Sequence, residues 1–129
     1  KENINNLLIL KPMSQRDYIS CIKACNFAVV LQPPSLKGLW YAPHNISKIG
    51  DFIALGKPVI TDSYVEDYVK DGVSGYICNN YEEISNLITK VKNKDDYVKL
   101  CEGAKAFTKK NLDYRIVANK LLELVNAKF

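Results

Sequence analysis

Short apolar runs recur along the first part of the chain. They cover residues 6–10 (NLLIL), 27–31 (FAVVL), 58–61 (PVIT) and 75–78 (GYIC), and polar residues, glycine or proline bound each run. Runs without alternating polar residues are typical of strands that are buried on both faces of a parallel sheet. The pattern therefore predicts four such strands.

Helical spacing of apolar residues separates the first two runs. Ser14, with Asp17 three residues later, forms a variant of the capping box that begins a helix. Asn26 is suited to end this helix in a left-handed conformation. The spacing predicts one amphipathic helix between these residues.

A second helix is predicted at 48–55, directly before the third apolar run. Ser47 is its expected N-cap and Gly56 its stop signal. Residues 64–70 favour one or two further helical turns, and Asp71-Gly72 favours a turn. From residue 80 onward, apolar residues recur at helical spacing and predict three amphipathic helices around 84–91, 98–107 and 116–125.

Strands that alternate with amphipathic helices indicate an α/β fold with a parallel sheet and right-handed crossovers. The 129 residues, 47% hydrophobic and 25% charged, lie within the usual size of one globular domain. We therefore expect residues 1–129 to form a single domain. Because the sequence begins at Lys1 and not at methionine, we also expect it to be part of a longer protein.

The charge pattern is mildly basic. The formal net charge is +4, and lysines in the second half of the chain are interleaved with Asp and Glu. This pattern is typical of a solvated helical surface, whereas nucleic-acid interfaces group basic residues with stacking aromatics, so no nucleic-acid partner is expected. No apolar run reaches the roughly 18 residues that span a bilayer, and no secretion signal is evident. A cytoplasmic protein is therefore expected.

The cysteine pattern favours neither disulfides nor a metal site. Cys21 and Cys25 are one helical turn apart, no C-x-x-C pair exists, and the one histidine, His44, is distant from Cys78 and Cys101 in sequence. We expect reduced, largely buried thiols and no metal or other cofactor.

Candidate ligand-binding residues follow the strand ends and open the second helix. In an open parallel sheet, ligands bind beyond the carboxyl ends of the strands, which here are 11–14, 32–45 and 61–64. Free N–H groups and the positive dipole end near Lys48 favour a phosphate. Asp51, one turn later, can accept hydrogen bonds from hydroxyls. An exposed Lys-Asp pair without a ligand is the alternative at this stage.

The run GDFIALGKPVITDSYVEDYVKDGVSGYIC resembles the signature of the GT-B-type glycosyltransferases of group 1 (family 4-like). The matching positions are Asp51, Gly56, Lys57, Pro58, Val59, Ile60, Glu66, Asp71, Gly72, Gly75 and Tyr76. The flanking segments are also similar, so that the resemblance covers nearly the whole chain. It implies a three-layer Rossmann-like domain, the C-terminal nucleotide-sugar-binding part of such an enzyme, with the acceptor domain absent from this chain.

The resemblance assigns donor binding to named positions. Asp51 matches the acidic residue, usually glutamate, that binds the donor ribose. Asn45, Ser47 and Lys48 precede it in a subgroup pattern and are implied to serve the diphosphate. Lys11-Pro12 matches the region beside the nucleotide base. No metal and no catalytic residue are implied for this chain.

The implied activity is transfer of a sugar, with retention, from a nucleoside-diphosphate sugar to a cell-surface glycan or lipid-linked acceptor. In the full-length protein the resemblance also suggests contact with the inner face of the membrane, while this portion alone is expected to be inactive. The family's other glutamate, near the donor sugar, falls on Pro43. A non-catalytic GT-B-like binding or structural module therefore remains an alternative, as does a nucleotide-sugar epimerase.

Overall fold

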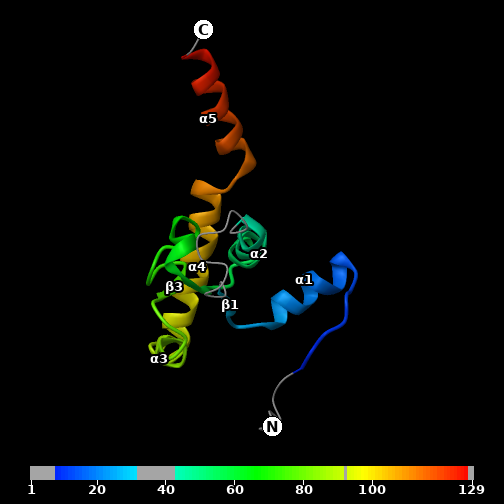
Figure 1. The fold of residues 1–129 in the computed structure, drawn as a ribbon, viewed down its shortest axis with the longest axis vertical. Coiled ribbons are helices and arrows are strands. Elements are labelled where there is room, and N and C mark those ends of the chain that lie inside the picture. The colour runs from blue at the N-terminus through cyan, green and yellow to red at the C-terminus, as the bar shows by residue number, and fades with distance from the viewer. Residues whose placement is uncertain (1–7, 32–42, 92, 128–129) are drawn as a thin grey trace.

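A short parallel sheet lies at the centre of the computed structural model, which describes residues 8–31, 43–91 and 93–127 (Figure 1). The strand order is β1-β2-β3, and both neighbouring pairs are parallel. The strands are β1 (Ala28–Val30), β2 (Val59–Asp62) and β3 (Gly75–Cys78). The mixed α/β class and the parallel sheet predicted from the apolar runs are confirmed.

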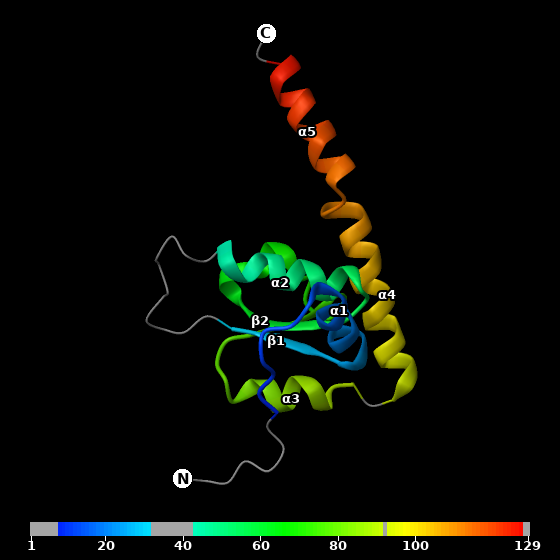
Figure 2. The same ribbon diagram turned by 90° about the vertical axis from the view of Figure 1, so that its right-hand side faces the viewer.

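Helices cover both faces of this sheet. Figure 2 shows α2 on one side of the strands and α3 on the other. Helix α2 also packs against α4, and α3 packs against β3. The helices are α1 (Gln15–Ala24), α2 (Pro43–Ala54), the 3₁₀ helix η2 (Ser63–Tyr68), α3 (Glu83–Thr89), α4 (Lys94–Asn111) and α5 (Tyr114–Asn126).

Two apolar clusters form the core, one on each face of β2. Val59 and Ile60 are fully buried, and they belong to different clusters because successive strand residues face opposite sides. This burial on both faces explains why β2 is a continuous apolar run. The first cluster is Ala28, Ile49, Ile53, Val59, Val65, Val69 and Ala104, and the second is Ile60, Cys78 and Leu87.

Helix α2 begins earlier than the sequence pattern predicts. Its first residue is Pro43, so Ser47 lies inside the helix and is not its N-cap. Proline suits the first helical position because its fixed φ is helical and the N–H it lacks has no partner there. The predicted end is confirmed, since the chain leaves the helix through Gly56, whose φ is 71°.

Helix α1 confirms the predicted capping box. The Ser14 hydroxyl accepts a hydrogen bond from the backbone N–H of Asp17 at 3.2 Å and donates one to its carboxylate at 2.7 Å.

The predicted end of α1 at Asn26 is wrong. Helix α1 ends at Ala24 with Cys25 already extended, and no described residue other than glycine has a positive φ. Asn26 therefore does not form a left-handed cap.

The predicted strand at 6–10 is not formed in its described part. Residues 8–10 belong to no strand, and Leu8 and Ile9 are 79% and 81% exposed. A strand is stabilised by backbone hydrogen bonds to a neighbour, and among the described residues β1 pairs only with β2. An apolar run that has no neighbouring strand to pair with does not form a strand, even when its β propensity is high.

The segment between β2 and α3 follows the prediction closely. The expected helical turns form η2, although as a 3₁₀ helix with Val65 outside helical geometry. Gly72 has φ 69° in the turn that follows, and β3 covers the predicted residues. The predicted helices near 84–91, 98–107 and 116–125 correspond to α3, α4 and α5.

Helix α5 projects beyond the sheet and the other helices in both views (Figures 1 and 2). None of its residues is buried, and Tyr114 and Leu124 are 78% and 61% exposed. Among the described helices, none has the length together with the apolar character that crossing a membrane requires.

The stabilisation that Asp113 and Arg115 provide at the start of α5 is expected to depend on pH. Asp113 accepts two hydrogen bonds from the Arg115 guanidinium, the shorter at 2.6 Å, and one from its backbone N–H, and these lower the Asp113 pKa from 3.8 to about 2. Because the folded pKa is below the unfolded one, this stabilisation is present above about pH 4 and is lost as the pH falls towards 2.

We expect the ¹³C shift of the Asp113 carboxyl group to titrate with a midpoint near pH 2 in the folded chain. In Arg115→Gln the midpoint should move up towards the ordinary aspartate value of about 3.9, because the guanidinium is gone. An unchanged midpoint in that variant would show that the capping contacts are not the cause.

Candidate functional site

The carboxyl edge of the sheet is formed by the ends of β1, β2 and β3. Helix α2 follows β1 in the chain and runs back from this side, so its N-terminal end lies at the same edge (Figure 2). Asp62 ends the central strand there and is only 9% exposed. Asp62 belongs to the predicted strand end at 61–64, and an acidic residue at the end of a buried strand is a usable sequence signal, although Asp62 was not among the predicted site residues.

Lys48 and Asp51 are both exposed on α2, but neither lies at its first residue. They follow Pro43 by five and eight residues, which corresponds to about 8 Å and 12 Å along the helix axis. The field of the helix terminus falls off within the first turn. The early start of α2 therefore removes the predicted placement of these two side chains at the helix end, and leaves Lys48 to act through its own charge.

Asp51 faces α1. The Tyr18 hydroxyl donates a hydrogen bond to Asp51 Oδ2 at 3.3 Å, across 33 residues of sequence. Desolvation raises the pKa of Tyr18, and the charge of Asp51 and this hydrogen bond raise it further. Tyr18 therefore stays protonated as a donor, and the carboxylate of Asp51 keeps acceptor capacity for another partner.

A pocket of about 250 Å³ lies between α1 and α2 at this contact. Its polar groups are the carboxylate of Asp51, the phenol of Tyr18 and the amide of Gln15, and apolar side chains form the rest. Carboxylate, phenol and amide groups together both accept and donate hydrogen bonds, as a ligand with hydroxyl groups requires. The lining residues are Gln15, Tyr18, Ile19, Ile22, Asp51, Ala54 and Leu55.

The other predicted site residues are not gathered into this pocket. Ser47 and Lys48 are exposed one turn closer to the start of α2, and they do not line it. Lys11 and Pro12 lie on the exposed segment before α1, outside the lining residues as well. The backbone of Asn45 belongs to α2, while its side chain is outside the described part of the structure.

The cysteines are all free thiols, as the sequence spacing predicts. The prediction that they are largely buried is wrong, because Cys25 is exposed and only Cys78 is buried. Cys25 follows the last residue of α1 in an extended conformation, so it is not part of the helix that carries the buried Ile22. Within the described ranges, no three His, Cys, Asp or Glu side chains are grouped in a way that could hold a metal ion.

These observations define a small α/β domain with a three-stranded parallel sheet and a pocket built around one carboxylate. No protein-family model, curated protein or solved structure gives a significant match to this chain.

Proposed function

We propose that this chain is the donor-binding portion of a retaining GT-B-type glycosyltransferase, which transfers a sugar from a nucleoside-diphosphate sugar to a glycan or lipid-linked acceptor. The observation that carries the proposal is the pocket at Asp51. The family resemblance pairs Asp51 with the donor ribose. The Asp51 carboxylate is exposed, lines the pocket and accepts a hydrogen bond from Tyr18, whose hydroxyl is a second group that can bind ligand hydroxyls.

The size of the pocket supports binding of one part of the donor. At about 250 Å³ it is slightly smaller than the roughly 300–1,000 Å³ typical of sites that enclose a whole ligand. A ribose fits this description better than a complete nucleotide sugar. Asp51 would accept hydrogen bonds from the ribose hydroxyls, and Tyr18, by donating to Oδ2, would orient the carboxylate.

Lys48 supplies the charge that a diphosphate needs. It lies three residues before Asp51 on α2, a rise of about 4.5 Å, and on a neighbouring part of the helix surface. An ammonium beside the diphosphate would stabilise the negative charge that develops on the leaving nucleoside diphosphate. We assign no catalytic residue to this chain, and the acceptor would be bound by the domain that the resemblance places before it.

The proposal predicts that nucleoside diphosphates bind this chain and that Asp51→Ala weakens them about 10- to 100-fold. This range corresponds to the roughly 1.5–3 kcal/mol of a hydrogen bond to a charged group. Lys48→Ala should weaken binding about threefold to fivefold, because exposed charge pairs contribute at most about 1 kcal/mol. Titration calorimetry with uridine, guanosine and adenosine diphosphate measures both effects.

Matched controls are available on α4. Lys99→Ala and Glu102→Ala remove one exposed charge of each sign from residues that do not line the pocket, and neither should change the affinity. If Asp51→Ala and Lys48→Ala bind as tightly as the parent chain, the site is wrongly assigned. If no nucleoside diphosphate binds at all, a non-catalytic module becomes the better explanation.

A further inference from the structure

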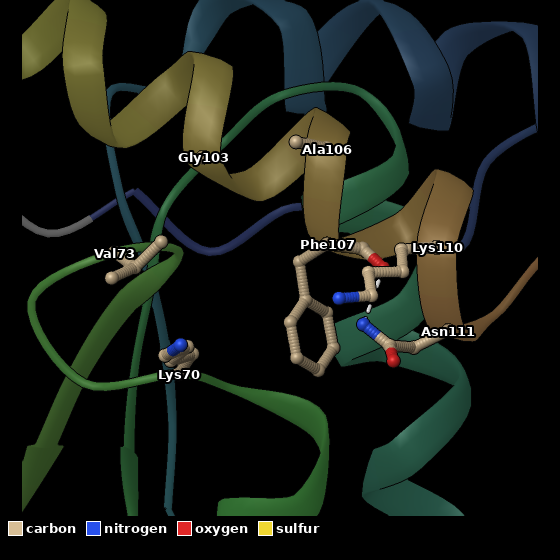
Figure 3. Close-up of a pocket in the computed structure, with 7 residues that line it drawn as sticks. All are labelled: Lys70, Val73, Gly103, Ala106, Phe107, Lys110 and Asn111. Carbon is tan, nitrogen blue, oxygen red and sulfur yellow. Dashed lines mark hydrogen bonds between the residues drawn. The ribbon is translucent and has the colours of Figure 1, made fainter.

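A second pocket, of about 330 Å³, lies between the loop that precedes β3 and the C-terminal half of α4 (Figure 3). It shares no lining residue with the pocket at Asp51. The loop enters β3 at its first residue, so this pocket is on the amino side of that strand and not at the carboxyl edge. The lining residues are Lys70, Val73, Gly103, Ala106, Phe107, Lys110 and Asn111.

The walls of this pocket are held in place by backbone contacts. A Cβ on Gly103 would lie 2.1 Å from the carbonyl oxygen of Val73, so α4 approaches the loop as closely as only glycine allows. The loop itself is fixed by Ser74, which is fully buried and whose hydroxyl accepts a hydrogen bond from the backbone N–H of Lys70 at 2.8 Å. The pocket is therefore bounded by two fixed segments.

The lining combines apolar side chains with two cations. Val73 and Ala106, which are exposed, and the half-buried Phe107 present apolar surface, and Lys70 and Lys110 are exposed as well. Figure 3 shows these two lysines reaching the pocket from different elements, with the Phe107 ring between them in this view. None of the seven lining residues is acidic.

A ligand with a negative charge is favoured over a cation in this pocket. Helix α4 ends at Asn111, and its terminal carbonyls carry the equivalent of about half a negative charge, which opposes an anion. Asn111 Nδ2 donates to the Phe107 carbonyl at 3.0 Å and so satisfies one of these groups. The two full positive charges of Lys70 and Lys110 outweigh the partial negative charge that remains at the end of α4. Neutralising the helix terminus accounts for Lys110, but not for Lys70, which comes from the facing loop.

We propose that this pocket binds a small amphiphilic anion, with its apolar body against Val73, Ala106 and Phe107 and its acidic group between Lys70 and Lys110. The site is separate from the donor site and stands whether or not the chain binds nucleotides. Its ligand class is a carboxylate, sulfonate or phosphate monoester that carries an aromatic or aliphatic group.

The test uses 8-anilinonaphthalene-1-sulfonate as the probe and the whole 129-residue chain, followed by ¹H–¹⁵N NMR. We expect chemical-shift changes at the backbone amides of Val73, Gly103 and Ala106. The neutral analogue N-phenyl-1-naphthylamine should bind about tenfold more weakly. Lys70→Gln combined with Lys110→Gln should also weaken the anionic probe about tenfold, since each exposed charge contributes a few-fold.

Two variants make this test specific. Lys109→Gln removes a neighbouring charge on α4 that does not line the pocket, and it should leave the affinity unchanged. Ala106→Leu fills the pocket without changing charge and should abolish the shifts. The proposal is overturned if the shifts fall on the exposed apolar residues of α5 instead, if the double glutamine variant binds like the parent chain, or if the neutral analogue binds equally well.

Discussion

Replacing Gly75 by alanine is expected to destabilise this chain by roughly 3 kcal/mol or more, the largest effect of any single methyl group that we foresee. A Cβ at Gly75 would lie 1.9 Å from the carbonyl oxygen of Val59 and 2.8 Å from its carbonyl carbon. These are backbone atoms of the central strand, paired with β3 at this register, so they cannot move aside without breaking the sheet. Urea denaturation measures the loss as a fall in the unfolding midpoint.

Gly50→Ala is the matched control for this substitution. Gly50 lies in the middle of α2, and a Cβ there would meet nothing within 4 Å. Alanine is a better helix former than glycine by about 1 kcal/mol, so this variant should be more stable than the parent. Equal stability of the Gly75→Ala chain and the parent would contradict the β2–β3 pairing that places these atoms together.

Ile53→Ala is expected to cost about 2–5 kcal/mol, the range measured for large-to-small changes in fully buried positions. Ile53 is 0% exposed and belongs to the cluster that joins α2 to β1, β2 and α4. Removing its side chain leaves a void between helices and sheet, where rigid neighbours on several elements limit collapse. The same denaturation experiment should show a lower midpoint with an unchanged slope, because the surface exposed on unfolding hardly changes.

Ile88→Ala is the control for this second substitution. Ile88 carries the same side chain on α3, but it is 42% exposed and belongs to neither core cluster. Its removal should cost less than about 1 kcal/mol. If the two isoleucine variants lose the same stability, Ile53 is not buried between α2 and the sheet as the first apolar cluster requires.

Much of the fold could be predicted from local pattern. The three strands and the later helices were found because both kinds of element depend on nearby residues: an unbroken apolar run for β2, or apolar positions three and four apart for α4. The strand predicted at 6–10 is not formed in its described residues, 8–10, because strand pairing is not local. The run NLLIL has the composition of a buried strand, but Leu8 and Ile9 have no paired edge among the described residues.

The candidate site was predictable only in part. Asp51 was singled out from its position on α2, but its neighbour Tyr18 is 33 residues away, and no spacing rule connects the two. The early start of α2 could have been anticipated from Pro43, since proline favours the first helical position. Ser47, a good capping residue, competed with that signal, so the predicted start at residue 48 is five residues too late.

The central claim, that Asp51 binds a donor ribose, is tested most directly by a titration that removes one ribose hydroxyl at a time. The parent chain and Asp51→Ala are each titrated with the best-binding nucleoside diphosphate and with its 2′-deoxy and 3′-deoxy analogues. We expect at least one deoxy analogue to bind the parent chain about tenfold more weakly, and this penalty to shrink to about twofold or less in Asp51→Ala, because alanine has no side-chain oxygen to accept a hydrogen bond from the hydroxyl. The same deoxy penalty in both proteins, or none in the parent chain, would contradict the claim.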